Sequence, residues 1–331
     1  MQDQTLADAL EAAERFGGVR PAARALGIPY TTFQGRVKRA KAAAVTPELP
    51  ADWHEPIADI IERQATQVAK RREVRRAREW FPVKVAEARP IGILWFGDPH
   101  IDDDSCDMDV LLRHVELCRE TPGLYGANIG DTTNNWVGRL TRLFGDQEAS
   151  QETARRLAKW FLVDSGVNWL LTLVGNHDAW NEGGEILSQM NSEQVPLIDW
   201  AAKFRLVFKN GRSVRVHAAH DFKGSSIWNK THGPSRAAQT GAADLYVCGH
   251  RHDWGIQHYE LPETDRAPVS IRCRGYKGFD HYAVRSGYAQ SRYGAAILTV
   301  IDPTAETPDG LVTPFANVET GARYLNMLRG A

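Results

Sequence analysis

The sequence lacks the features of several specialised protein classes. No run of residues approaches the ~18 consecutive apolar residues that a membrane-spanning helix needs, and the polar first residues contain no hydrophobic segment of a secretory signal. The four cysteines form no Cys-x-x-Cys pair, which argues against a zinc ribbon and against a disulfide scaffold. No Gly-x-Ser-x-Gly motif offers a serine nucleophile. We therefore expect a cytoplasmic protein that does not bind a membrane.

What is present is an ordinary globular composition with an uneven charge distribution. The 331 residues are 43% hydrophobic and 24% charged, and this length favours two domains. The net charge is −1, yet residues 1–90 hold 16 Lys and Arg against 12 Asp and Glu, whereas the rest of the chain holds 24 against 29. A basic front favours contact with phosphate groups, and an acidic body that contains histidines favours cation binding.

Residues 1–44 are predicted to form a small all-α domain. Apolar residues follow a helical period up to Phe16, and Gly17-Gly18 and Gly27-Ile28-Pro29 mark turns between three helices. The stretch VRPAARALGIPYTTFQGRVKRA resembles a helix-turn-helix module. In such modules the last helix enters the major groove of DNA, and its contacting residues would be Thr32, Gln34, Arg36, Lys38 and Arg39. The alternative is an assembly or targeting module whose basic face is solvated.

Residues 45–90 are predicted to connect this domain to the rest of the chain. The prolines in Val45–Pro50 mark a linker, and residues 54–80 follow as one long helix whose end, residues 70–78, is rich in Lys and Arg. That end is either a solvated helix face or an electrostatic track for nucleic acid. The helix could also pair with a second copy of the chain, so a homo-oligomer is possible.

Residues 91–331 are predicted to form an α/β body. Short apolar runs alternate with helical stretches near residues 107–119 and 148–163, and such runs are typical of strands buried on both faces. Asp, Asn or His follows each run within a few positions. Because ligands of open α/β sheets bind at the carboxyl ends of strands, these polar residues are expected to meet in one crevice. The runs are Ile91–Phe96, Ala127–Ile129, Leu170–Val174, Val214–Val216 and Leu245–Cys248.

The residue types that follow the runs favour metal ions. Carboxylate, amide and imidazole groups without a thiolate suit Mn, Fe, Zn or Ni rather than Cu(I) or an iron–sulfur cluster. The set exceeds what one ion needs, so two divalent ions that share one carboxylate fit better. A single histidine is more often an ordinary core or surface residue than a metal ligand. Here Asp, Asn or His follows each of five apolar runs in turn, and this repetition favours metal ligands.

In this order the blocks resemble those of the calcineurin-like metallophosphoesterase superfamily. They read Asp98-Pro-His100, Gly-Asp131-Thr-Thr-Asn134, Gly-Asn176-His177-Asp178, a histidine after the fourth run, and Gly-His250-Arg251-His252. The resemblance covers roughly residues 91–300. It implies a four-layer αββα sandwich, a dinuclear metal centre, and hydrolysis of phosphoesters by a hydroxide bound to the metals.

The resemblance also implies a ligand set. The first ion would be bound by Asp98, His100 and His252, and the second by Asn176 and His250, with Asp131 as the bridge between them. One more ligand of the second ion is the histidine after the fourth run, which is either His220 or His217, with His220 favoured. Mn²⁺ is the favoured metal, with Fe, Zn or Ni as alternatives.

His177 is implied as the general acid that protonates the leaving oxygen, a step that contributes ~10²–10⁴-fold to the rate. Asp178 is expected to orient its imidazole. Candidate substrate contacts are Asn134, Lys223 and Arg251. Further candidate contacts to phosphate are Arg274, Lys277 and Arg285. The acidic run Asp102-Asp103-Asp104 is interpreted as a solvated turn or helix start, with a minor supporting role behind the ligands as the alternative. Aromatic residues that could stack on bases are Trp180, Trp228, Trp254, Tyr276 and Tyr288.

The blocks depart from those of the Ser/Thr protein phosphatases, which carry Gly-Asp-x-x-Asp-Arg-Gly and Gly-Asn-His-Glu. The N-terminal module shifts the expectation towards DNA, and the combination resembles phage or prophage proteins. The first hypothesis is therefore a metal-dependent phosphodiesterase acting on DNA, in effect a nuclease. The second is a phosphatase or phosphodiesterase for a nucleotide or another small molecule. The third is a DNA-binding regulator whose catalytic body is inactive.

Overall fold

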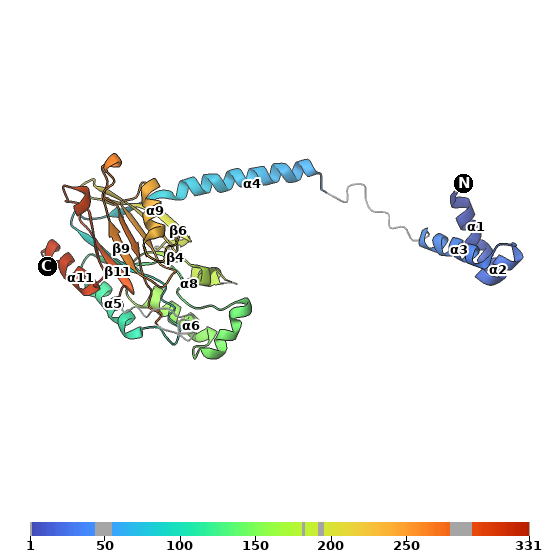
Figure 1. The fold of residues 1–331 in the computed structure, drawn as a ribbon, viewed down its shortest axis with the longest axis horizontal. Helices are drawn as coiled ribbons and strands as arrows, with labels where there is room; N and C mark the ends of the chain where they lie inside the picture. The colour runs from blue at the N-terminus through green and yellow to red at the C-terminus, as the bar shows by residue number, and fades with distance from the viewer. Residues whose placement is uncertain (1, 44–54, 181–182, 191–194, 279–292, 331) are drawn as a thin grey trace. The chain divides into compact units, whose positions relative to one another are not determined.

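The computed structural model describes residues 2–43, 55–180, 183–190, 195–278 and 293–330 (Figure 1). These residues fall into two compact units, Met1–Arg72 and Glu73–Ala331. The linker predicted at residues 45–50 lies outside the described residues, as do Arg285 and Tyr288. Among the described helices, none combines the length and the apolar character that crossing a bilayer requires.

The first unit contains three short helices at the positions that the sequence predicts, and it also includes most of the long helix α4 (Ile57–Arg78). The three short helices are α1 (Gln2–Arg15), α2 (Val19–Ala25) and α3 (Tyr30–Ala43). Small and apolar side chains from all three form the core, among them Ala9, Ala22 and Phe33. Gly17 and Gly27 have φ angles of 72° and 64° in the turns, a conformation that glycine adopts without steric cost.

The second unit begins earlier than the predicted residue 91. Helix α4 (Ile57–Arg78) leads directly into strand β1 (Glu79–Val85), which pairs in parallel with β6 (Ala201–Phe208). Phe81 and Val83 pack against the core, but the strand is only half-buried and contains a proline. Proline is tolerated at a sheet edge, where β1 lies. The strand was missed because it has no continuous apolar run.

Twelve strands form two six-stranded sheets among the described residues. The order in sheet A is β1, β6, β7 (Ser213–Ala219), β8 (Leu245–Cys248), β10 (Val269–Arg272) and β9 (Gly255–His258). The order in sheet B is β12 (Val312–Phe315), β11 (Ala296–Ile301), β2 (Ile91–Phe96), β3 (Leu124–Asn128), β4 (Trp169–Val174) and β5 (Leu197–Asp199). Strands β2 to β5 run parallel, and β7 runs parallel to β8.

The two sheets pack face to face, and helices cover their outer faces. Trp95 of β2 and Phe204 of β6 belong to the same buried cluster, which places the main core between the sheets. A second cluster joins sheet B to α5 (Met108–Glu120) and α11 (Val318–Arg329). A third joins sheet A to α9 (His232–Thr240). Figure 1 shows α5 and α11 on one side of the strands and α9 on the other. The predicted four-layer αββα sandwich is therefore confirmed.

The remaining α-helices in the described part of the chain are short. They are α6 (Gln151–Lys159), which continues as one π-helical turn (Trp160–Asp164), α7 (Asn176–Ala179) and α8 (Gly183–Met190). Three 3₁₀ segments span Gly138–Asp146, Pro262–Thr264 and Pro308–Gly310.

The core between the sheets gives a direct stability prediction. Phe204 is fully buried and stacks on Phe81 with ring centroids 5.8 Å apart. We expect Phe204→Ala to lower the free energy of unfolding by about 3–5 kcal/mol, because it removes buried area and leaves a cavity. The control Leu112→Ala removes an exposed side chain and should change it by less than about 0.5 kcal/mol. Urea unfolding followed by tryptophan fluorescence measures both, and equal losses would contradict the assigned core.

Candidate metal centre

The predicted ligands lie just beyond the carboxyl ends of five strands. Asp98 and His100 follow β2, Asp131 follows β3, Asn176 begins α7 after β4, His220 follows β7, and His250 and His252 follow β8. Strands β2, β3 and β4 belong to sheet B, whereas β7 and β8 belong to sheet A. The site therefore combines loops from both sheets at the strand ends where α/β folds bind ligands.

The closest group of ligand atoms surrounds His220. Its Nε2 atom lies 3.2 Å from Asp131 Oδ2, 2.9 Å from Asn176 Oδ1 and 3.1 Å from His250 Nδ1. Turning the Asn176 amide around would instead let its NH₂ group donate to both imidazoles. With the oxygen inward, atoms that carry lone pairs face one another, and a divalent cation suits such a set of oxygen and imidazole donors.

A backbone hydrogen bond prepares His220 for this role. Its Nδ1 lies 2.9 Å from the carbonyl oxygen of Ile129, to which an Nδ1–H group donates. Nε2 then faces Asp131, where its lone pair becomes available to a cation once its proton is lost, as in metal-binding histidines whose second nitrogen is held by a carbonyl. The side chain is completely buried. Its orientation is therefore fixed before any ion binds.

A second group of ligand atoms lies on the other side of Asp131. Nε2 of His100 is 3.9 Å from Asp131 Oδ2, and the His100 ring stacks on His252 with centroids 5.2 Å apart. Among the described residues, Asp98 Oδ1 and both ring nitrogens of His100 are buried without a hydrogen-bond partner. Buried polar atoms without partners are costly and rare. A cation coordinated by these atoms would remove that cost, so the residues fit a second metal ion.

The electrostatics of the centre favour positive charge. Burial raises the pKa of Asp98 to about 8. Burial lowers the pKa of His220, but its hydrogen bond to Asp131 and the charges of Asp98 and Asp131 outweigh this and raise it to about 9. The buried carboxylates thus hold a proton in place of a cation, and a metal ion would displace it.

The backbone at the centre is strained. Nine non-glycine residues in the described part of the chain have positive φ, and five of them are predicted ligands. Such conformations cost of order 1–3 kcal/mol each and concentrate at functional sites. These five are Asp98 (34°), His100 (39°), Asp131 (53°), His250 (71°) and His252 (49°).

Glycines next to the ligands allow the loops to approach one another. A Cβ atom on Gly175 would lie 2.2 Å from Asp131 Oδ1, and one on Gly249 would lie 2.5 Å from Asp98 Oδ2. Both distances are too short for any side chain. Close packing around the centre therefore requires glycine at position 175, before Asn176, and at position 249, before His250.

His177 stands at the edge of the centre. Its Nδ1 forms a hydrogen bond with the carbonyl oxygen of Asn134, and its Nε2 lies 4.0 Å from Asp131 Oδ2. The side chain is 15% exposed, so Nε2 is reachable by a substrate. Burial lowers the pKa of His177, although the charge of Asp131 acts in the opposite direction. This position suits a group that exchanges a proton with a bound substrate.

Asp178 makes other contacts than the predicted one to the His177 ring. Its carboxylate accepts hydrogen bonds from the backbone N–H groups of Thr132 (2.9 Å) and Gly175 (3.0 Å), and among the described residues it forms no hydrogen bond with the His177 ring. Burial raises its pKa to about 7. Asp178 therefore ties the two loops that carry Asp131 and Asn176 to each other.

Asn134 is buried and belongs to a polar network, which corrects its assignment as a substrate contact. Its side-chain amide donates to Asp103 Oδ2 (2.8 Å) and to Gln147 Oε1 (2.9 Å). Asp102 accepts from the Asn134 backbone (2.8 Å) and from Gln147 (3.0 Å). The acidic run forms a turn as predicted, but Asp102 is buried in this network and only Asp104 of the three is exposed. Gln147 was missed because only the folded chain brings it to this loop. The network holds the carbonyl that contacts His177.

The other predicted contacts divide into paired, buried and exposed groups. Arg251 forms an ion pair with Asp221 (3.0 Å), and Lys223 is exposed. Arg274 and Tyr276 are buried, and Trp254 packs against the core.

Lys277 is held by two contacts. It forms an ion pair with Asp103 (2.8 Å) and lies 5.0 Å from the Trp136 ring. Among the predicted phosphate contacts, only Lys223 and Arg251 therefore have exposed side chains in the described part of the chain.

The structure places the two candidate histidines after the fourth run in different environments. His220 lies in the centre, whereas the His217 ring packs on Phe222 (4.8 Å) and Tyr246 (5.7 Å). Those two aromatic residues belong to the cluster beneath α9, on the outer face of sheet A. Burial lowers the pKa of His217 to about 4. Of these two histidines, His220 is the one that faces Asp131.

The residues predicted to contact DNA lie along α3 of the first unit. Thr32, Gln34, Lys38 and Arg39 are exposed, and Arg36 is half-buried. Phe33, Val37 and Ala40 of the same helix are buried. The helix therefore presents its basic residues on the side that does not pack.

No family model matches the chain, and no curated protein sequence matches it. Solved structures share parts of its backbone arrangement. They include NAD nucleotidase of Haemophilus influenzae (TM-score 0.38, 12% identity, 69% of this chain and 49% of that chain). They also include a calcineurin-like phosphoesterase of Bacillus subtilis (0.36, 12%, 73% and 97%) and 5'-nucleotidase of Candida albicans (0.37, 11%, 74% and 56%). This chain spans about half the length of the two nucleotidases.

A metal-binding measurement tests whether His220 or His217 is the ligand. We expect His220→Ala to weaken Mn²⁺ binding by at least tenfold, because it removes a buried ligand that is already oriented. His217→Ala is the matched control, and its Mn²⁺ affinity should stay within about twofold of the parent. Isothermal titration calorimetry measures both. A loss of affinity in His217→Ala alone would reverse the assignment.

Proposed function

We propose that the protein is a phosphoester hydrolase that works with two divalent metal ions. The observation that carries this proposal is the position of Asp131 between two groups of ligand atoms. Its Oδ2 lies 3.2 Å from His220 Nε2 and 3.9 Å from His100 Nε2. Pairs of ions about 3.5–4 Å apart serve in-line displacement at phosphorus. The donor set fits Mn²⁺, Fe, Zn or Ni, and Mn²⁺ is the first metal to supply.

When bound, the ions would polarise the phosphoryl group and lower the pKa of water. The chain itself supplies positioned groups around them. His177 holds a proton at Nδ1 that it donates to Asn134 O, so a proton taken up at Nε2 is the one available to the leaving oxygen. Asp102 and Gln147 fix the loop that carries Asn134. An alkoxide is a poor leaving group. Protonation of the leaving oxygen by His177 therefore increases the rate most for phosphate esters of alcohols.

Three tryptophans beside the centre favour a substrate that carries a base. Trp180 and Trp136 lie 4.2 Å and 5.3 Å from the His177 ring, and Trp200 lies 5.1 Å from the His220 ring. Trp200 is 40% exposed, and Trp180 and Trp136 are partly exposed. Stacking of bases on aromatic side chains is sequence-tolerant. The tryptophans fit nucleic acid and free nucleotides equally.

The first unit favours DNA over a free nucleotide. Exposed Lys38 and Arg39 of α3, together with basic residues of α4, give this part of the chain the positive charge that phosphate contacts require. A nuclease acting on DNA is therefore the first candidate. A nucleotide phosphatase or phosphodiesterase, with the first unit used for assembly or targeting, is the second. An inactive regulator is disfavoured, since no ligand block is missing from the sequence.

The general acid is tested by changing the leaving group. We expect His177→Ala to lower kcat on DNA by ~10²–10⁴-fold with Mn²⁺ present. The loss on bis(p-nitrophenyl) phosphate should be much smaller, because p-nitrophenolate leaves without protonation. His258→Ala, which changes an exposed histidine, is the control and should match the parent on both substrates. Equal losses on both substrates would contradict the role of His177 as the acid.

DNA binding by α3 is tested separately from hydrolysis. We expect the triple variant Arg36→Gln, Lys38→Gln, Arg39→Gln to weaken binding of duplex DNA and to reduce the salt dependence of log Kd by roughly three units of slope, one per lost phosphate contact. Hydrolysis of bis(p-nitrophenyl) phosphate should not change. Fluorescence anisotropy at several salt concentrations measures the slope, with Arg15→Gln as the control in the same unit. Unchanged DNA binding in the triple variant would favour the assembly role.

A further inference from the structure

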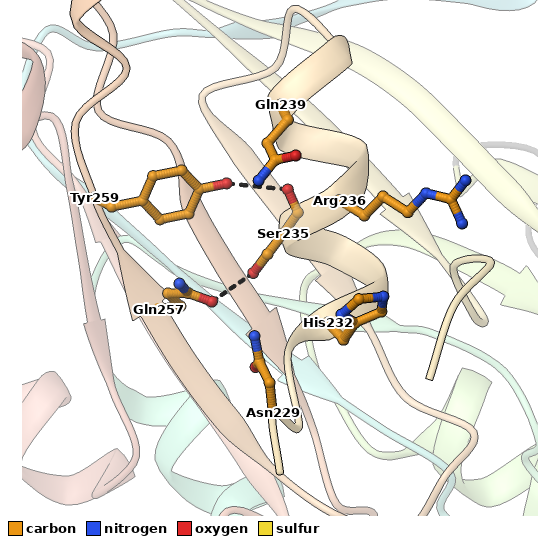
Figure 2. Close-up of a pocket in the computed structure, with 7 residues that line it drawn as sticks. All are labelled: Asn229, His232, Ser235, Arg236, Gln239, Gln257 and Tyr259. Carbon is orange, nitrogen blue, oxygen red and sulfur yellow. Dashed lines mark hydrogen bonds between the residues drawn. The ribbon is translucent and has the colours of Figure 1, made fainter. Parts of the chain in front are cut away.

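A polar cavity of about 460 Å³ lies beside α9 on the outer side of sheet A, away from the core between the sheets. Seven side chains line it, and all of them are polar (Figure 2). None of the seven is a carboxylate. Its volume falls within the usual range of ligand sites, ~300–1,000 Å³.

The cavity presents hydrogen-bond donors. The side-chain oxygen of Asn229 accepts from the backbone N–H (3.0 Å) and the hydroxyl (2.8 Å) of Thr231. The side-chain oxygen of Gln257 accepts from the hydroxyl of Ser235 (2.7 Å), and it also lies 2.9 Å from the Thr231 hydroxyl, whose single proton goes to one of the two amide oxygens. The acceptor end of each amide is therefore occupied, and the NH₂ ends remain to donate to a ligand. Figure 2 shows Asn229 and Gln257 at one end of the lining, with the bond to Ser235 dashed.

The charge of the cavity is positive. Arg236 is exposed, and among the described residues its guanidinium forms no hydrogen bond or ion pair. His232 lies one helical turn before it, on the same side of α9 (Figure 2). Guanidinium and amide donors without a neighbouring carboxylate select an anion, and Arg is the residue best suited to phosphate.

The cavity adjoins the metal centre through two segments. Lys230, the residue after Asn229, pairs with Asp253 (3.3 Å), and Asp253 follows the predicted ligand His252. On the other side, a Cβ atom on Gly224 would lie 2.9 Å from the His232 ring, and Gly224 is only four residues beyond His220. Four residues span at most ~14 Å. A chain of nucleotides that reaches the centre can therefore also reach the cavity.

The loop between His220 and α9 carries an exposed aromatic side chain. Trp228 is 89% exposed and directly precedes Asn229, and Ile227 beside it is 77% exposed. A large aromatic ring so fully exposed next to a donor-rich cavity matches the pairing of base stacking with phosphate contact that single-stranded nucleic acid uses.

We propose that this cavity is a second phosphate-binding site, which holds a backbone phosphate of a single nucleic acid strand next to the ester bond at the metal centre. Asn229 and Gln257 donate to the phosphate. The exposed Arg236 side chain, which extends away from these two amides in Figure 2, turns towards the phosphate when the strand binds, and Trp228 stacks on the adjacent base. The inference rests on the proposed function, and it narrows the substrate to an unpaired strand several nucleotides long.

The test compares a short strand with a substrate too small to reach the cavity. The strand is the trithymidylate pTpTpT, which is also too short for a helix-turn-helix contact, and the small substrate is bis(p-nitrophenyl) phosphate. In the full-length protein with Mn²⁺, Arg236→Gln and Trp228→Ala should each raise KM for the strand by about tenfold. Turnover of the small substrate should stay within twofold. Arg113→Gln, at an exposed arginine of α5, is the control.

A binding measurement without metal separates this inference from the proposed function. In EDTA, anisotropy of fluorescein-labelled trithymidylate should show an approximately tenfold weaker Kd for Arg236→Gln and no change for Arg113→Gln. If binding and KM are both unchanged in Arg236→Gln, the second site is refuted, while metal-dependent hydrolysis can stand. If the parent hydrolyses neither substrate but Arg236→Gln still weakens binding of the strand, the proposed hydrolase function is contradicted, and the second phosphate-binding site is supported.

Discussion

The site depends on the buried carboxylate of Asp131. Its Oδ1 accepts from the backbone N–H of His177 (2.8 Å), and its Oδ2 faces ring nitrogens of His220, His100 and His177 at 3.2, 3.9 and 4.0 Å. One side chain that is 2% exposed thus contacts loops from both sheets. The positive φ of Asp131 and the missing Cβ of Gly175 are both consequences of this close approach. The proposed metal binding and the proposed role of His177 as the general acid both depend on this geometry.

Such a centre costs stability, and the packed sandwich makes that cost tolerable. Strained backbone at five ligands and buried atoms without partners, such as Asp98 Oδ1, all destabilise the folded chain. The core between the sheets, in which Trp95 and Phe204 are fully buried, holds the strand ends in place despite this destabilisation. Asp178 adds direct hydrogen bonds between two of the loops. A cation at the centre would relieve part of the electrostatic cost, so metal binding and folding are expected to be coupled.

The positions of the candidate ligand blocks could be predicted because each block is short and closely follows a strand whose apolar run is visible in the sequence. The contacts around them could not, since they join segments far apart in sequence. Asn134 meets Asp102 across 32 residues, and Asp178 meets Thr132 across 46. Strand β6 was missed because its buried and exposed residues alternate, and β1 because it is half-buried at an edge. The cavity beside α9 left no pattern in the sequence, because its donors come from a loop, a helix and a strand.

The central claim is that Asp131 holds two ions together, and counting bound metal tests it most directly. The account predicts two Mn²⁺ per chain after equilibrium dialysis and mass spectrometry, with a spin-coupled pair visible by electron paramagnetic resonance. Asp131→Asn should lose the coupled signal and at least one ion, whereas Asp164→Asn, at an exposed carboxylate, should keep both. One ion in the parent chain, or an unchanged coupled pair in Asp131→Asn, would contradict the account.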